Sequence, residues 1–209
     1  LNLKQLGGKK LSYNNYNDIF AALLISRSLP KNNGTVIIKH ANPCGVSINK
    51  DKLKSYKLAL ACDPISAFGG IVSCNFKIKK NLALELKKIY LEVVICNGIE
   101  NDALKILKNK KNLRIIDVSN LNGSNLNNIS SQFNSFLIQT PDTLSFSKSN
   151  FKVVSKIKPS SKILKNLIFA FNVCRFVKSN AVVITNNDST IGIGSGQSSR
   201  LDSCEVAIK

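Results

Sequence analysis

The chain has 209 residues, 44% of them hydrophobic, and its mean hydropathy is +0.01. This composition suits one large domain or two small ones, and no apolar run is long enough to span a membrane. The net charge of +18 would fit a nucleic-acid-binding protein, but only four of the thirty basic residues are arginines. Because nucleic-acid surfaces favour clustered arginines and interleaved aromatic residues, the dispersed lysines argue against that partner and fit attraction of anionic substrates.

Predicted helices and strands alternate through the first 118 residues. Asn17 and Asp18 can cap a helix that ends before Pro30. Hydrophobic periodicity predicts strands over residues 35–39, 71–76, 92–96 and 113–118, and helices over 52–61, 81–90 and 101–110. Residues 62–70, which contain a proline and a glycine pair, are predicted to form a loop. Such alternation is typical of a layered α/β sheet.

The composition changes after residue 118. Residues 119–131 are rich in Asn and Ser and are expected to form a linker or surface loop. Beyond them the pattern predicts strands over 136–140, 151–155 and 181–185 and a helix over 159–178, followed by a glycine-rich segment over 191–196. We therefore predict one largely complete α/β domain over residues 1–128 and the start of a second, truncated one over 129–209.

The strongest candidate for chemistry is the pair Lys39-His40, which directly follows the β-branched run at residues 35–38. His40 is the only histidine of the chain, and its side chain type suits proton transfer near neutral pH. Lys39 can stabilise a developing oxyanion. The pair is placed where a strand ends, which is where α/β proteins collect ligand sites. The alternative is a solvated basic pair on the surface.

The six cysteines form no C-x-x-C pair, and a single histidine excludes a two-histidine metal site. The zinc-deaminase signature H-x-E with P-C-x-x-C is not met, because the Glu after His40 and the second Cys after Cys44 are both missing. We therefore expect no zinc and no other metal. The strand-like settings of Cys74 and Cys96 favour buried thiols in a reducing compartment, so we expect a cytoplasmic protein without disulfides.

Four further positions carry weaker signals. Glu92 heads an apolar strand and would need a partner if it is buried, or it lies at an exposed strand end. Asn180 follows the long helix, either as a cap or as an amide that contacts a ligand. Gly69 lies in a turn where a backbone could approach a ligand. Arg200 follows the glycine-rich segment and could bind a carboxylate or phosphate, or the segment could simply bend into a helix.

Together these motifs resemble the AICAR transformylase part of the bifunctional purine-biosynthesis family, which also carries IMP cyclohydrolase. The resemblance rests on motifs that occur in family order over nearly the whole chain: residues 11–15 (LSYNN), 39–45 (KHANPCG), 63–64 (DP), 66–70 (SAFGG), 178–181 (KSNA) and 192–200 (GIGSGQSSR). It implies transfer of a formyl group from 10-formyltetrahydrofolate to the 5-amino group of AICAR, giving FAICAR and tetrahydrofolate in purine biosynthesis.

The resemblance also implies roles for single residues. His40 matches the proton acceptor for the weakly nucleophilic amine, and Lys39 matches the lysine that stabilises the transition state. The positions that resemble nucleotide contacts are Gly69, Glu92 and Asn180. The positions where folate contacts are expected are Arg200 and Leu201.

The family resemblance further implies a fold of two tandem cytidine-deaminase-like α/β domains without zinc, and a homodimer whose active sites are shared between subunits. The chain is expected to be an internal segment of a longer protein. It lacks the cyclohydrolase domain, the basic motif that grips the AICAR phosphate and a C-terminal remainder. We therefore expect the 209 residues alone to be inactive or barely active.

Three other functions stay open from the sequence. A basic nucleic-acid-binding protein would show a steep salt dependence of DNA binding. A zinc nucleoside deaminase would contain bound metal. A non-catalytic remnant would keep the site residues only as scaffold.

Overall fold

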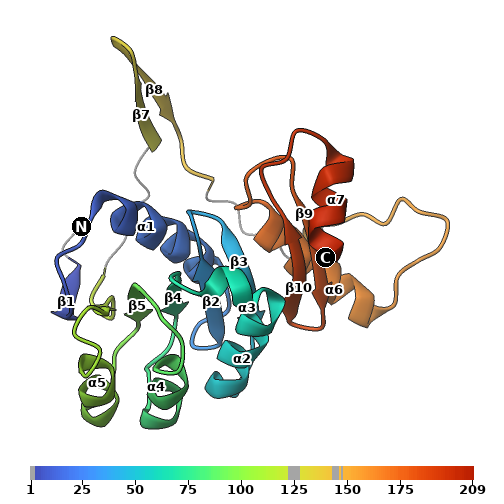
Figure 1. Cartoon of the computed structure of the whole chain (residues 1–209). Helices are drawn as coiled ribbons and strands as arrows, with labels where there is room; N and C mark the ends of the chain where they lie inside the picture. Colours follow the sequence, from blue (N-terminus) through green and yellow to red (C-terminus); the bar gives the residue numbers. More distant parts are fainter. Residues whose placement is uncertain (1–2, 122–127, 143–145, 147) are drawn as a thin grey trace.

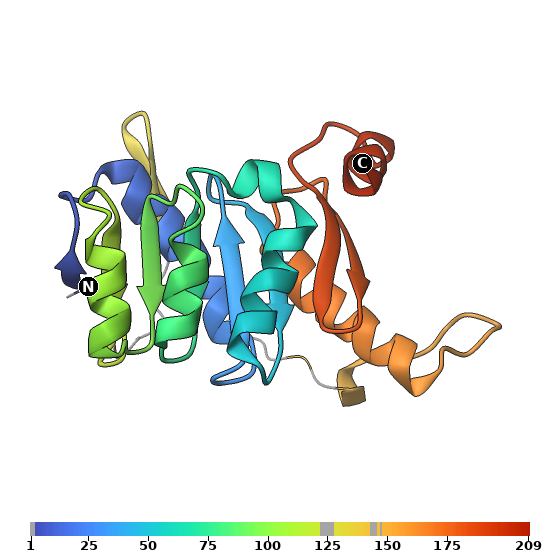
Figure 2. The same ribbon diagram turned by 60° about the horizontal axis from the view of Figure 1, so that its bottom comes forward.

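The computed structural model describes residues 3–121, 128–142, 146 and 148–209. Within these residues, eight strands form one mixed sheet in the order β1-β6-β5-β4-β2-β3-β10-β9, and two strands form a separate hairpin. Helices cover both faces of the large sheet, and the two chain ends lie at opposite ends of it (Figures 1 and 2). The expected α/β class is confirmed.

The centre of the sheet is formed by the first part of the chain. Strands β4 (Ile71–Cys74), β5 (Val93–Cys96) and β6 (Arg114–Asp117) run parallel, with the short β1 (Lys4–Gly7) antiparallel at the edge. Strand β2 (Gly34–Ile38) pairs antiparallel with β4 and forms a hairpin with β3 (Pro43–Ile48). Strands β2, β4 and β5 are buried throughout, as expected for apolar runs covered on both faces.

Each face of the sheet has its own core. Helices α2 (Lys52–Cys62), α4 (Lys80–Leu86) and α5 (Asn101–Lys108) pack on the face that carries Ile37. Helices α1 (Tyr13–Ser28) and α6 (Ser161–Cys174) pack on the face that carries Val36 and Ile38. The alternation of these three residues along β2 follows the two-residue period of a strand. Both cores are therefore anchored on the strand that precedes Lys39.

A second hairpin extends the sheet beyond β3. It consists of β9 (Val182–Asn186) and β10 (Ser189–Gly194), and β10 pairs antiparallel with β3. Helix α6 precedes this hairpin and helix α7 (Arg200–Ile208) follows it. The order helix–strand–strand–helix thus occurs twice, as α1-β2-β3-α2 (first unit) and α6-β9-β10-α7 (second unit). The two units meet through their second strands.

The separate hairpin of β7 (Asn128–Gln132) and β8 (Ser135–Gln139) projects from the body of the molecule (Figure 1). Its large apolar side chains are exposed, namely Ile129, Phe133, Phe136, Leu137 and Ile138. An isolated hairpin is marginally stable in water, and exposed apolar side chains that lie together are typical of interaction surfaces. A 3-10 turn, η1 (Lys148–Asn150), follows it.

Several boundaries differ from the sequence-based prediction. Helix α1 begins at Tyr13 rather than after Asp18, because Ser12 and Asn15 form a capping box that satisfies its first backbone donors. The short helix α3 (Pro64–Ala67) replaces part of the expected loop, with Asp63 as its cap. Residues 151–155 form no strand. The predicted linker over 119–131 ends in β7, and its residues 122–127 lie outside the described part.

Candidate functional site

The Lys39–His40 pair lies at one edge of the large sheet, directly after β2. Ile38 at the end of β2 pairs with Ile71 at the start of β4, because these two strands are antiparallel. Since β5 and β6 run parallel to β4, the pair also lies at the amino ends of three parallel strands. The expectation that it follows a strand end is confirmed. The site is nevertheless at the opposite edge from the one that collects ligands in parallel sheets.

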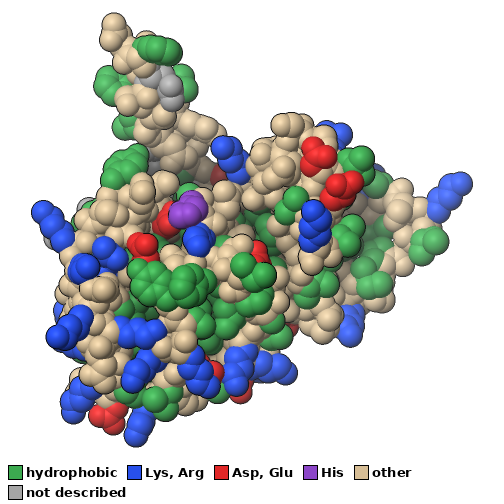
Figure 3. Space-filling model, viewed as in Figure 1, with side chains coloured by type: hydrophobic (Ala, Val, Ile, Leu, Met, Phe, Trp, Pro, Cys, Tyr) green, Lys and Arg blue, Asp and Glu red, His purple; other side chains and the backbone are tan. Residues whose placement is uncertain are grey.

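A tight turn connects β2 to β3 and presents His40. The Lys39 N–H donates to the Asn42 carbonyl at 2.9 Å, and Ala41 has a left-handed φ of +55°. The peptide bond between Lys39 and His40 is cis. The Ala41 N–H donates to Oδ1 of Asp18 at 2.6 Å, so helix α1 holds the turn from one side. His40 itself is exposed, and it lies on the surface beside acidic and basic side chains (Figure 3).

Lys39 is fixed against the loop that precedes β4. Its Nζ donates to the Phe68 carbonyl at 2.5 Å. Gly69 adopts a φ of +74°, and a Cβ there would lie 3.7 Å from Nζ of Lys39 and from the ring of Tyr90. The Gly69 N–H donates to the Tyr90 carbonyl at 2.8 Å. The structure therefore brings Gly69 next to Lys39, and a side chain at Gly69 would be in van der Waals contact with Lys39 and Tyr90.

Glu92 lies on the same edge, one residue before β5. Its N–H donates to the Gly70 carbonyl at 3.0 Å, so its position follows from the loop that contains Gly69. Its Oε2 accepts from Nδ2 of Asn15 at 2.7 Å and lies 3.8 Å from Nη1 of Arg114. The Glu92 side chain keeps 40% of its surface exposed. The carboxylate is therefore oriented by two partners and still reachable by a ligand.

Burial shapes the chemistry of two other groups at this edge. It raises the pKa of the Asp18 carboxyl above 3.8, while the Ala41 N–H and the charge of His40 act in the opposite direction. Burial also raises the pKa of the Cys44 thiol to about 12. A thiol with so high a pKa stays protonated at neutral pH, so Cys44 is not a nucleophile here.

Asn42 connects this turn to the second unit. Its Nδ2 donates to the His40 carbonyl at 3.3 Å, and its Oδ1 accepts from the N–H of Lys178 at 3.2 Å. Lys178 and Asn180 precede β9, so one side chain bridges the His40 turn and the segment that carries Asn180. Sequence reasoning did not select Asn15, Asp18, Asn42 or Arg114, although the first three lie in or beside quoted motifs.

Asn180 is tied to the glycine-rich segment. Its Nδ2 donates to the carbonyls of Gln197 and Ser198, both at 3.0 Å, and its carbonyl accepts from Oγ of Ser203 at 2.8 Å. The N–H of Gly196 donates to the Lys178 carbonyl at 2.7 Å. The amide nitrogen of Asn180 is thus occupied by backbone carbonyls, which leaves Oδ1 as the atom available to a ligand.

Arg200 and Leu201 lie in the first turn of α7, where Ser199 caps the helix through the N–H of Asp202 at 3.0 Å. Both are exposed, Leu201 to 68%. Neither lines the cavity described next. The structure does not bring them into contact with His40.

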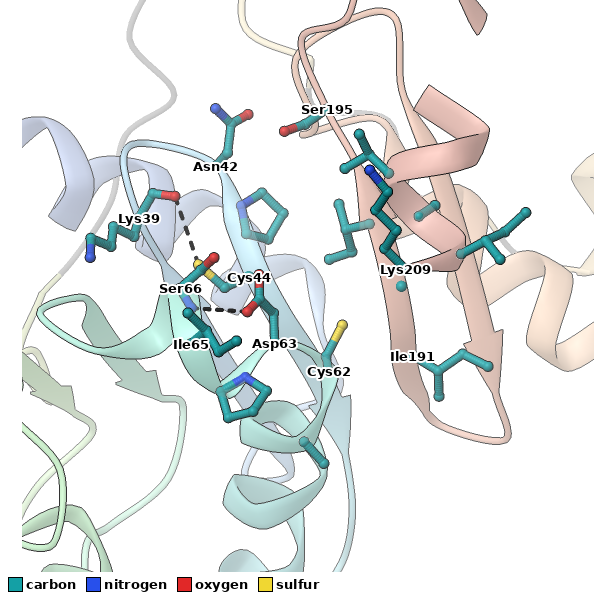
Figure 4. Close-up of a pocket in the computed structure, with 18 of the residues that line it drawn as sticks. Lys39, Asn42, Cys44, Cys62, Asp63, Ile65, Ser66, Ile191, Ser195 and Lys209 are labelled. Carbon is teal, nitrogen blue, oxygen red and sulfur yellow. Dashed lines mark hydrogen bonds between the residues drawn. The ribbon is translucent and has the colours of Figure 1, made fainter. Parts of the chain in front are cut away.

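A cavity of about 800 Å³ lies beside the junction of the two units and is lined by residues of both (Figure 4). One wall comes from the β2–β3 turn, α2 and α3, and the other from β10 and α7. Its polar lining includes Lys39, Asn42, Asp63, Ser66, Ser195 and Gln197. Figure 4 shows the Lys39 side chain directed away from the β10 wall while its carbonyl faces the Cys44 thiol. The cavity therefore adjoins the His40 turn without containing His40.

Comparison with known proteins assigns the chain to a family. A family model described as the AICARFT/IMPCHase bienzyme matches residues 1–209. The chain belongs to this family. It is similar to the bifunctional purine biosynthesis protein PurH of Bacillus cereus (strain ATCC 10987), with 41% identity over 206 residues covering 98% of the chain and 40% of that protein. The similarity to PurH of Rhodospirillum rubrum is 44% over 209 residues, covering 98% of the chain and 39% of that protein.

PurH of Leptospira biflexa is 42% identical over 202 residues, which cover 96% of the chain and 39% of that protein. The chain thus spans about 40% of the length of the curated relatives it matches. Among the described residues, His, Cys, Asp and Glu side chains form no group of three that could hold a metal ion. No helix in that part of the chain combines the length and apolar character needed to cross a membrane.

Proposed function

We propose that this chain carries part of the active site of an AICAR transformylase. The reaction transfers a formyl group from 10-formyltetrahydrofolate to the 5-amino group of AICAR, giving FAICAR and tetrahydrofolate. The observation that carries the proposal is the family match over all 209 residues, combined with a His40 turn ordered beside Glu92 and Gly69. The longer protein is proposed to be cytoplasmic and to carry IMP cyclohydrolase as well.

The proposed roles follow from the chemistry of each group. The amine of AICAR is a poor nucleophile, so His40 accepts its proton during attack on the formyl carbon. Lys39, with Nζ held by the Phe68 carbonyl, stabilises the negative charge that develops on the formyl oxygen. Neither role requires a metal, and the folate is a co-substrate rather than a resident cofactor.

Three residues are proposed to bind the nucleotide. The exposed part of the Glu92 carboxylate accepts hydrogen bonds from hydroxyl or amide groups. Gly69 admits the ligand close to the backbone because it has no side chain. Asn180 offers Oδ1, since its amide nitrogen is already bonded to Gln197 and Ser198.

Arg200 and Leu201 are proposed to contact folate across a subunit boundary. Both are exposed and lie outside the cavity beside Lys39. A homodimer with shared sites, in which a second copy supplies the folate contacts, would bring them to a His40 turn. The exposed apolar side chains of the β7–β8 hairpin support a dimer, because a second copy would cover them.

The fold is proposed to be the start of two tandem cytidine-deaminase-like domains, divided near residue 128. The repeated order helix–strand–strand–helix supports this division, because the first and second units have the same succession of elements. The second domain would then continue beyond the residues described.

The test compares wild type with His40→Ala in the natural full-length protein, following tetrahydrofolate formation from AICAR and 10-formyltetrahydrofolate. Loss of the proton acceptor should lower kcat about a hundredfold to ten-thousandfold while circular dichroism stays unchanged. Lys111→Ala, an exposed lysine in the turn after α5, is the matched control and should keep full activity.

A folded wild-type protein without turnover would contradict the transformylase proposal and favour a non-catalytic remnant. Binding to DNA with a steep salt dependence would favour the nucleic-acid alternative. Bound zinc that is required for activity would favour a deaminase. Unchanged kcat in His40→Ala would mean that the protein catalyses formyl transfer but that His40 is not the proton acceptor.

A further inference from the structure

Asp18 is a buried carboxylate directly behind the His40 turn. It lies in the second turn of α1, and only 8% of its surface is exposed. Its Oδ1 accepts the N–H of Ala41 at 2.6 Å, a short bond to the residue that follows His40. Because this N–H is directed at a buried side chain of α1 and not at solvent, it needs an acceptor there.

The charges that face Asp18 come from the elements packed around it. His40 on the β2–β3 turn is the favourable one, and Glu92 before β5 is the unfavourable one. The Cys44 thiol on β3 is protonated at neutral pH, and Arg114 on β6 lies against Glu92 rather than against Asp18. Among these groups, His40 therefore carries the favourable charge that faces Asp18.

An ionised Asp18 does not help the chain to fold. Burial raises its pKa above 3.8, so the folded state holds the proton more tightly than the unfolded state does. Stability is then highest below the unfolded pKa and falls as pH rises through the folded pKa. At neutral pH the carboxylate costs folding free energy, and the amide of asparagine, which also accepts a hydrogen bond, would avoid that cost.

We propose that Asp18 is a positioning residue for His40, which fixes the turn through Ala41 and supplies a negative charge to the imidazolium formed during catalysis. This inference rests on the proposed formyl transfer. As the C–N bond to the formyl carbon forms, the amine loses a proton to a ring nitrogen of His40. When the bond between the formyl carbon and N10 of the folate breaks, that proton passes to N10, and His40 is neutral again. Asp18 stays ionised and stabilises the charged stage between the two transfers.

The test uses Asp18→Asn and Asp18→Ala in the natural full-length protein. Asparagine keeps an acceptor for Ala41 and removes the charge, so the Tm should stay equal or rise while kcat falls about tenfold to hundredfold at constant KM. A loss of kcat without a loss of Tm separates the missing negative charge from a merely structural role. Alanine removes both the acceptor for Ala41 and the negative charge, so it should lower Tm as well as kcat.

The matched control is Asp117→Asn at the opposite edge of the sheet. Asp117 also accepts hydrogen bonds from backbone N–H groups, those of Gly98 at 3.1 Å and Ser119 at 2.9 Å. It lies at the carboxyl end of β6, whereas His40 lies at the amino ends of the parallel strands. The substitution should leave kcat unchanged. Wild-type-like kcat in Asp18→Asn would overturn the inference while leaving formyl transfer intact. A wild-type protein without turnover would instead overturn the proposed function.

Discussion

The first unit and the second unit have the same order of elements but different surroundings. Strand β2 of the first unit is buried along its whole length between two helix layers. Strand β9 of the second unit lies at the sheet edge and is only half-buried. The residues with ionisable chemistry, Lys39 and His40, follow the buried strand, whereas Asn180 precedes the edge strand. The proposed proton acceptor thus follows the more deeply buried strand, and the proposed binding residue Asn180 precedes the more exposed one.

The difference extends to the helices that follow each hairpin. Helix α2 packs against β3, β10, β2 and α4, whereas the main partners of α7 are β10 and β9. In both units a glycine lets the strand approach the helix: a Cβ at Gly45 would overlap the Ala59 carbonyl, and one at Gly192 would overlap the Ala207 carbonyl. The same local contact therefore occurs once where the helix packs against more neighbouring elements and once where it packs against fewer.

The largest expected effect is the contrast between Gly45→Ala and Gly192→Ala. At Gly45 the helix cannot retreat, so the added methyl group should destabilise the protein by about 3 kcal/mol or more. At Gly192 the shift of α7 should reduce the cost to about 1–2 kcal/mol. Urea unfolding of both variants measures the difference. Equal losses would show that the second unit is packed as tightly as the first.

A smaller effect is expected where the two units join. Asn42→Ala removes the bonds to the His40 carbonyl and the Lys178 N–H, each worth about 1 kcal/mol. Because the segment that carries Asn180 would no longer be held to the His40 turn, KM for AICAR should rise several-fold. Asn42→Asp keeps the acceptor for Lys178 and should restore much of the wild-type KM. If Asn42→Ala leaves KM unchanged, the two units are positioned independently of this side chain.

The regular part of this architecture was predictable from the sequence. The runs at 35–38 and 71–74 are apolar and β-branched, and both form strands as predicted. Strand β3 was missed because Pro43 and Gly45 break the strand pattern. The glycine is there because α2 approaches closely, and that approach depends on packing rather than on local preference.

The candidate site was predictable only in part. The position of Lys39 and His40 after a strand came from local pattern, and the structure places Gly69 and Glu92 at the same edge. Asp18 was assigned to a helix cap, because a short-range pattern does not reveal a hydrogen bond to a residue 23 positions away. The roles of Arg200 and Leu201 stay predictions, since both are exposed and lie outside the cavity beside Lys39.

The smallest effect concerns the core of the first unit. Tyr56 on α2 is 1% exposed, and its hydroxyl has no hydrogen-bond partner among the described residues. Burial raises the pKa of this phenol, in keeping with an apolar environment. A buried hydroxyl without a partner loses its hydration, so Tyr56→Phe should stabilise the protein by about 1 kcal/mol. Thermal unfolding measures this change, and Phe76→Leu on the same side of the sheet is a control that should destabilise through lost volume. A lower Tm for Tyr56→Phe would mean that the hydroxyl makes a hydrogen bond, and that this hydrogen bond stabilises the first unit.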